Sequence, residues 1–262
     1  MRHARLIALV FACCSVPLPA QTADELVNKN IAAKGGMDRI LTIRSLRSSG
    51  TMQQGSFTVQ VGKESMAPKL LRQTFTIQGM TAITAYDGST GWQLSPFQGR
   101  REAELLGEDD LRGLMEEADF YGPLVNYKEK GNTVEYLGHD TIDGDDALRL
   151  KVTLKNGDIF NYYLDPDTYL EIRIEAMQFI RGAVRETVTD LGSYKKVDGV
   201  YFTFSMEVGS RENPDNRAKV TIDKMEANVP IPLTDFQMPA APAIPSPQKH
   251  PEPSQPRKER SL

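Results

Sequence analysis

The chain has 262 residues, of which 40% are hydrophobic and 25% are charged, and its formal net charge is −4. This weakly acidic balance offers no basic surface for nucleic acid or for a polybasic membrane contact, so both are excluded as partners. The only two cysteines are Cys13 and Cys14, and the rest of the chain must be stabilised by an ordinary core rather than by disulfides.

Residues 1–20 have the layout of a secretory signal peptide. Two arginines precede an apolar run over residues 6–16, and the small residue Ala20 ends the segment. A transmembrane anchor is the weaker alternative, because a spanning helix needs about 20 apolar residues. A lipoprotein signal is a second alternative, although Phe-Ala before Cys13 is a poor lipobox. Without residues 1–20 the chain keeps 29 basic and 35 acidic residues, a net charge of −6. We expect a periplasmic or secreted protein with no transmembrane segment after the signal is removed.

Few residues could support catalysis or metal binding. His3 leaves with the signal and His250 lies near the C-terminus, so the body of the chain holds only His139. With one histidine and no cysteine, Cys/His nucleophile pairs and the usual transition-metal cages are excluded. The acids of residues 108–119 could form a metal site or a carboxylate pair, but they are typical of a solvated helix face. The aspartates of residues 143–146 and 165–167 lack the spacing and the terminal Glu of a calcium loop, and they are typical of turns. We therefore expect no catalytic residue, no metal site and no cofactor.

The body begins with two predicted helices. Thr22 and Glu25 have the spacing of a capping box, and an amphipathic pattern continues from there to Lys34. Gly35 and Gly36 end this helix, and a second short helical turn is expected over residues 37–43. The apolar residues of both segments lie along one side, so we expect the helices to pack on a sheet.

The clearest sheet element is a hairpin within residues 81–96. One strand ends at Tyr86, Asp87-Gly88 supplies residues that a tight turn tolerates, and the return strand opens with Trp92, the only tryptophan. We expect Tyr86 and Trp92 to form a cross-strand aromatic pair that fixes the register.

Alternation with a period of two runs through most of the chain after residue 44. Besides the hairpin, strands are predicted over residues 57–61, 71–77, 148–154, 159–164, 170–176, 183–191, 200–208 and 220–222. Residues 102–119 interrupt the pattern with an amphipathic helical segment. The chain is therefore predicted to be α+β, with a single large curved antiparallel sheet.

The size of this sheet suggests a cleft. Roughly ten to twelve strands at about 4.8 Å each span about 50 Å, which two helical segments about 10 Å wide cannot cover. An open sheet of this size curls, and its concave apolar face then suits an acyl chain. A closed dry core is the alternative for each residue taken singly. The expected lipid-binding cavity is lined by Phe57, Val59, Val61, Leu71, Phe75, Ile77, Trp92, Leu94, Leu111, Leu114 and Met115.

The C-terminal part of the chain changes composition abruptly. Seven prolines and several charged residues follow Met238, with almost nothing apolar between them. Such a segment is typical of a disordered tail. We therefore expect a signal peptide over residues 1–20, one folded domain over residues 21–236 and a Pro-rich tail over residues 237–262.

Several short motifs resemble outer-membrane lipoprotein-sorting proteins of the LolA/LolB-like superfamily. They are Lys34-Gly35-Gly36, the hairpin from Tyr86 to Trp92, Ala118-Asp119-Phe120 with Leu124-Val125, Tyr163-Leu164-Asp165 and the stretch from Tyr194 to Val200. The resemblance implies a half-barrel whose helices cover a hydrophobic cavity on the concave face, and a non-enzymatic periplasmic carrier or chaperone for the acyl chains of lipoproteins or lipids. The Pro-rich tail departs from the short carriers of the family. An alternative function on the same scaffold is an envelope sensor or interaction module with envelope protein partners.

Overall fold

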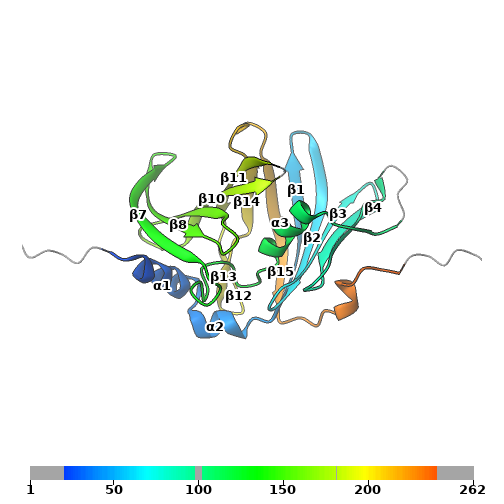
Figure 1. The fold of residues 1–262 in the computed structure, drawn as a ribbon, viewed down its shortest axis with the longest axis horizontal. Helices are drawn as coiled ribbons and strands as arrows, with labels where there is room; N and C mark the ends of the chain where they lie inside the picture. Colours follow the sequence, from blue (N-terminus) through cyan, green and yellow to red (C-terminus); the bar gives the residue numbers. More distant parts are fainter. Residues whose placement is uncertain (1–20, 98–101, 181, 241–262) are drawn as a thin grey trace, which may run out of the picture.

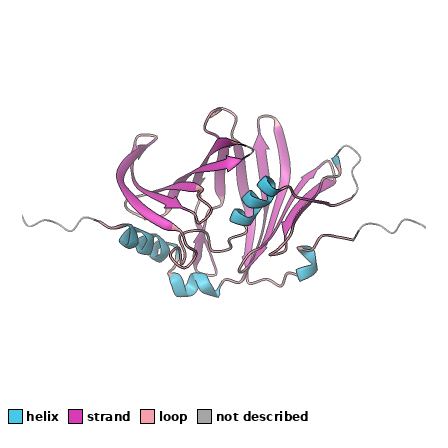
Figure 2. Cartoon of the chain, in the orientation of Figure 1, coloured by secondary structure: helices cyan, strands magenta, loops and turns pink. Residues whose placement is uncertain are grey.

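The computed structural model describes residues 21–97, 102–180 and 182–240. The expected signal peptide and residues 241–262 of the expected tail lie outside the described residues. Three α-helices, α1 (Ala23–Lys34), α2 (Met37–Thr42) and α3 (Glu108–Glu117), and a 3-10 turn, η2 (Leu233–Asp235), accompany a large sheet (Figures 1 and 2). None of the helices in the described ranges has the length and apolar character of a membrane span.

The main sheet has 13 strands in the order β6-β5-β4-β3-β2-β1-β15-β14-β11-β10-β9-β8-β7, and all the pairings are antiparallel. Its strands are β1 (Ser45–Gln54), β2 (Phe57–Met66), β3 (Leu70–Ile77), β4 (Met80–Tyr86), β5 (Gly91–Leu94), β6 (Glu104–Leu105), β7 (Thr133–Ile142), β8 (Asp145–Thr153), β9 (Ile159–Leu164), β10 (Glu171–Ile180), β11 (Ala183–Gly192), β14 (Ser205–Ser210) and β15 (Ala218–Ala227). A separate ribbon pairs β12 (Lys195–Val197) with β13 (Val200–Phe202). The predicted α+β class with one large antiparallel sheet is confirmed, and the sheet curves around the helices (Figure 1).

Local sequence accounts for the first helix. The hydroxyl of Thr22 accepts a hydrogen bond from the backbone N–H of Glu25, whose side chain accepts one from Thr22 N–H, as the capping box predicts. Gly35 ends the helix at φ 133°, and a Cβ there would come within 2.7 Å of the carbonyl oxygen of Gly199. Glycine is therefore required where the helix end meets the β12–β13 ribbon.

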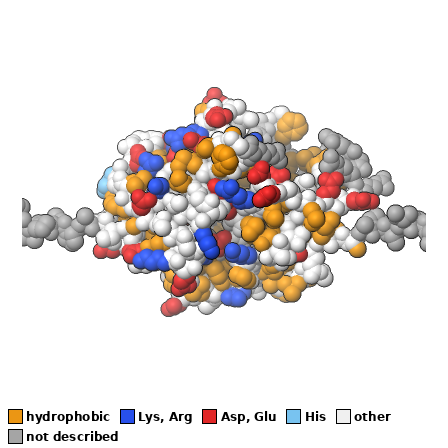
Figure 3. All heavy atoms as spheres, viewed as in Figure 1, with side chains coloured by type: hydrophobic (Ala, Val, Ile, Leu, Met, Phe, Trp, Pro, Cys, Tyr) orange, Lys and Arg blue, Asp and Glu red, His pale blue; other side chains and the backbone are white. Residues whose placement is uncertain are grey.

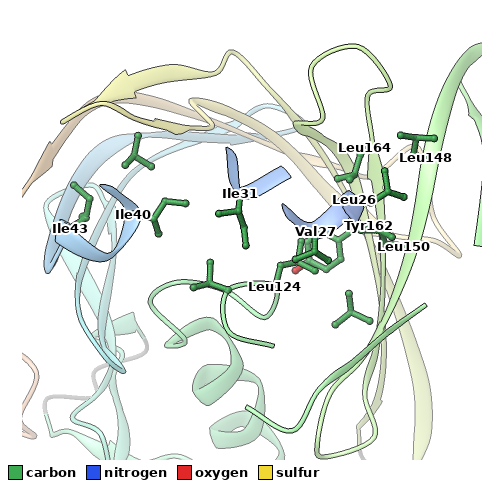
Figure 4. Packing of buried hydrophobic residues seen from close by; sticks show 13 residues of the cluster. Leu26, Val27, Ile31, Ile40, Ile43, Leu124, Leu148, Leu150, Tyr162 and Leu164 are labelled. Carbon is green, nitrogen blue, oxygen red and sulfur yellow. The ribbon is translucent and has the colours of Figure 1, made fainter. Parts of the chain in front are cut away.

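The larger core cluster lies where α1 and α2 pack on strands β8 and β9. Leu26 of α1 lies beside Leu150 and Leu164 of the sheet, whereas Ile31 points toward Leu124 of the loop after α3 (Figure 4). Leu26, Leu150 and Leu164 are fully buried. The expected packing of the N-terminal helices on the sheet is therefore confirmed.

The expected aromatic pair in the hairpin is wrong. The first strand ends at Tyr86 as predicted, but the return strand begins at Gly91, one residue before Trp92. The Asp87 carboxylate accepts hydrogen bonds from the backbone N–H groups of Ser89 and Thr90 at 2.9 and 2.7 Å. However, Gly91 lies opposite Tyr86, and Trp92 lies opposite Ala85. Since Gly91 belongs to the return strand, the turn has one residue fewer than a Tyr86–Trp92 pair needs, and the two aromatic side chains point to opposite faces.

Candidate functional site

The concave face of the sheet is the side that carries the helices. Residues directly opposite each other on paired strands share a face, so the register assigns each side chain to one side of the sheet. Leu71 pairs with Tyr86, and both contact Leu114 of α3 in the second core cluster. The residues of β3 that lie an even number of positions from Leu71, and the residues paired with them on neighbouring strands, therefore belong to the concave face.

Six of the predicted cavity residues share this face, although their environments differ. The register places Phe57, Val59, Val61, Leu71, Phe75 and Ile77 on the concave side of β2 and β3. Leu71 and Val59 are buried, at 0% and 7% exposure, whereas Phe57 is 75% exposed. Val61 and Phe75 are partly buried and belong to neither core cluster.

Trp92 and Leu94 do not lie with these residues. Trp92 pairs with Ala85, and Leu94 pairs with Ile83. Ala85 and Ile83 alternate with the concave residues of β4, so both pairs lie on the opposite, convex face. The indole Nε1–H of Trp92 donates a hydrogen bond to the carbonyl oxygen of Phe236 at 2.8 Å, and both side chains are buried. Trp92 therefore anchors the end of the folded body against the back of the sheet, and the expectation that one cavity includes it is corrected.

A line of partly buried apolar side chains crosses the middle of the concave face, with a step of two residues between β1 and β2, where Met52 pairs with the buried Val59 and Val61 pairs with Gly50. In β1 and β15, Met52 pairs with Val220, and Val220 pairs in turn with Met206 of β14. On the other side, Phe75 lies between Val61 and Ala82. We call this line the apolar track, and its members are Met52, Val61, Phe75, Ala82, Met206, Val208 and Val220.

The apolar track lies between the two core clusters and contains none of their residues. Sequence reasoning missed its members on β1, β14 and β15. The alternation of Met206 and Val208 was visible, but the pairing of β1 with β15 joins segments about 170 residues apart and has no local signal.

Exposed apolar residues continue the track to one edge of the concave face. Ile77 and Met80 pair across the β3–β4 turn and are 36% and 43% exposed, and Phe57 begins β2 on the same face. The neighbouring sequence from Gln73 to Tyr86 contains no charged residue. This rim offers apolar surface to a ligand without a charge to desolvate.

Helix α3 crosses the concave side between the two halves of the sheet (Figure 1). Leu114 is 5% exposed in its cluster, Leu111 packs against that cluster, and Met115 is 41% exposed. A Cβ on Gly91 would lie 2.6 Å from the Leu111 side chain, so the helix approaches the β5 backbone closely. On the face shown in Figure 3, apolar side chains gather on both sides of α3. The helix therefore covers part of the concave face through Leu111 and Leu114, whereas Met115 belongs to neither core cluster.

The other side of α3 is fixed by polar groups. The Arg112 guanidinium donates hydrogen bonds to both carboxylate oxygens of Asp158 in the β8–β9 turn, and to the carbonyl oxygen of Phe179 at 3.3 Å. The Glu116 carboxyl accepts from the amides of Asn156 at 2.7 Å and Gln178 at 2.6 Å. We call Arg112, Glu116, Asn156, Asp158 and Gln178 the polar anchor.

The two carboxyls of the polar anchor have shifted pKa values. Burial, together with the neighbouring Asp158, raises the pKa of Glu116 to about 7. Burial opposes ionisation of Asp158 as well, but hydrogen bonds from Glu116 and Arg112 hold the pKa of Asp158 below its ordinary value. Glu116 therefore carries the proton when the pair is singly ionised.

Two hollows lie apart from the apolar track. One, of about 710 Å³, is open and lies where α1 meets α2, next to Asp38, Arg39 and Asp198. The other, of about 340 Å³, lies around the ion-paired Arg47, Glu64 and Arg72. Both are lined mainly by charged and small polar groups, so neither offers an apolar cavity.

Comparison with solved structures places this architecture among known folds. A DUF1329 family protein from Desulfovibrio piger matches with a TM-score of 0.58 at 13% identity, covering 82% of this chain and 97% of that one. A LolA superfamily protein from Nitrosomonas europaea matches with a TM-score of 0.56 at 11% identity, covering 83% and 98%. The chain has a LolA-like fold. The predicted half-barrel class is thus confirmed.

An outer membrane lipoprotein-sorting protein domain from Vibrio parahaemolyticus shares this LolA-like fold, with a TM-score of 0.55 at 14% identity over 81% of this chain and 94% of that domain. Comparisons with family models and with curated proteins give no match. The likeness therefore concerns the fold, and function must be argued from the chain's own residues.

Proposed function

We propose that this protein is an exported, non-enzymatic carrier that binds the acyl chains of lipoproteins or lipids on its concave face. The apolar track is the observation that carries the proposal. Its side chains are partly buried, they lie between two packed clusters, and α3 passes over the same side of the sheet. Apolar surface left in contact with water costs about 25 cal/mol per Å², which an acyl chain lying along the track would recover.

The apolar rim supports the same proposal. Phe57, Ile77 and Met80 extend the concave apolar surface to the edge of the sheet, where a chain could enter. The LolA-like fold of a lipoprotein-sorting domain adds support at the level of architecture. Sorting of outer-membrane lipoproteins across the periplasm is the process that we assign to this carrier.

The proposal includes the organisation of the chain. Residues 1–20 act as the export signal, residues 21–236 form the carrier domain, and residues 237–262 form a tail that the domain does not need. The buried contact of Trp92 with Phe236 supports this C-terminal boundary, because Phe236 is 0% exposed and Gln237 is exposed.

An envelope sensor or interaction module is the second candidate, because the same apolar rim could contact a protein. Binding of a fluorescent fatty acid to the purified protein separates the two functions. A carrier binds the probe, is displaced by unlabelled lipid, and gains thermal stability from either ligand. A pure protein-interaction module shows no saturable binding and no stabilisation.

A further inference from the structure

We propose that α3 is a strap whose polar anchor opens as the pH rises, so that ionisation of Glu116 controls access to the concave face. The inference rests on the proposed function for its biological meaning, since the strap crosses the face that we assign to the acyl chain. Its physical basis is the anchor itself and can be measured independently of any ligand.

The two sides of the strap are held by different forces. On the β3–β5 side, Leu111 and Leu114 pack against Leu71 and Tyr86, and the Glu117 carboxylate accepts one hydrogen bond from Gln73 of β3. On the β8–β10 side the contacts are the hydrogen bonds and the ion pair of the polar anchor. Ionisation of Glu116 therefore acts on the anchor side, and the mainly apolar β3–β5 side is left to serve as the hinge.

The charge balance of the anchor sets the direction of the switch. In the described ranges, the charged groups facing Glu116 are Asp158 of the β8–β9 turn and Arg112 of α3 itself, while β10 supplies the neutral amide of Gln178. With Glu116 protonated, one guanidinium faces one carboxylate. With Glu116 ionised, the same guanidinium faces two carboxylates, and both lie in a shielded place, at 13% and 2% side-chain exposure. Release of the strap into water removes this repulsion.

The pH window follows from the two states of Glu116. In the closed strap its pKa is about 7, against the ordinary value of 4.5 that it regains when the strap is released. Because the closed state binds the proton more tightly, closure is favoured at low pH and is weakened as the pH rises toward 7. These two pKa values predict that the equilibrium ratio of released to closed strap grows by about tenfold between pH 6 and pH 8.

Hydrogen exchange of residues 108–117 in the full chain tests the proposal, after correction for the intrinsic pH dependence of amide exchange. We expect strap exchange to rise by about tenfold from pH 6 to pH 8. Glu116→Gln keeps the shape and cannot ionise, so its exchange should not respond to pH. Glu117→Gln is the matched control, because Glu117 accepts a hydrogen bond from Gln73 outside the anchor. This variant should respond like the wild type.

Two outcomes overturn the strap: exchange that is independent of pH in the wild type, or a full pH response in Glu116→Gln. If Glu116→Gln does not fold, Asp158→Asn is used instead, because it removes the second carboxylate. For the proposal to stand, hydrogen exchange in Asp158→Asn must rise less between pH 6 and pH 8 than it does in the wild type. Uptake of a fluorescent fatty acid is followed in the same samples. Failure to bind at every pH contradicts the carrier function and leaves the exchange result to decide the strap.

Discussion

Phe75 is the residue at which ligand binding and stability should separate most clearly. It is partly buried on the concave face, lies between Val61 and Ala82, and contacts neither core cluster. Replacing it by glutamine keeps a side chain of similar reach and removes the apolar ring. An acyl chain on the apolar track would then lie against an amide with no partner.

The expected magnitudes follow from burial. Full burial of a phenylalanine is worth about 1.5–3 kcal/mol, so the part left for a ligand contributes about 1 kcal/mol. An amide desolvated without a partner costs about 1–3 kcal/mol more. Phe75→Gln should therefore weaken binding by about 2–4 kcal/mol, or about 30-fold to 1000-fold. Loss of the buried part should cost about 1 kcal/mol of stability, a shift in Tm of about 2–4 °C.

Two further variants serve as controls for this prediction. Leu71→Ala opens a cavity in a fully buried position and should cost about 2–5 kcal/mol of stability. Ile83→Gln makes the same apolar-to-amide change on the convex face, where Ile83 pairs with Leu94. Affinity for a fluorescent fatty acid and thermal melting are measured on the same samples. If Phe75→Gln binds within twofold of the wild type, or Ile83→Gln weakens binding equally, the assignment of the concave face is refuted.

Three other predictions concern stability. Removal of residues 239–262 should change Tm by less than about 3 °C, and a larger drop would mean that the tail packs on the domain. Phe236→Ala, in contrast, should lower the free energy of unfolding by about 3–5 kcal/mol. Lys34→Met removes the ammonium that lies 2.6 Å from the Glu171 carboxylate, whose side chain is 5% exposed. We expect the free energy of unfolding, measured by denaturant titration, to fall by about 3–5 kcal/mol. An unchanged free energy of unfolding would contradict a stabilising role of the ion pair. Burial favours the neutral form of Glu171, but Lys34 holds the pKa of Glu171 below the ordinary value of 4.5. The stabilisation from this ion pair is therefore present above pH 4.5 and is lost as the pH falls through the lowered pKa. Thermal melting between pH 3 and pH 6 measures this loss.

The sequence predicts the local elements of this fold well. The capping box at Thr22, the end of a strand at Tyr86 and a helix within residues 102–119 all follow from short-range patterns, and each is present. The single long strand predicted over residues 200–208 is instead two strands, β13 and β14, which flank Phe204. Phe204 is buried where the chain leaves the ribbon for the main sheet, and alternation alone does not reveal such a transfer.

The candidate site is less accessible to sequence reasoning, because it depends on register. A register shift of one residue moves a side chain to the other face of the sheet. The sequence pattern predicts Trp92 and Leu94 in the same cavity as Leu71 and Phe75, but the observed register places them on the convex face. The polar anchor brings together residues from α3, the β8–β9 turn and β10, which are up to 66 residues apart in the sequence and meet where α3 lies over the sheet. The pattern of acids over residues 108–119 predicts a solvated helix face, yet the Glu116 side chain is 13% exposed and burial raises its pKa.

Native mass spectrometry of the protein extracted from its own cell envelope tests the central claim most directly. We expect a population whose excess mass equals that of one or more acyl-chain lipids, and this excess should be released by organic solvent and reduced in Phe75→Gln. Ile83→Gln should carry the same lipid as the wild type. Protein that bears no lipid mass in gentle extraction, and that binds no fatty acid afterwards, would contradict the carrier function.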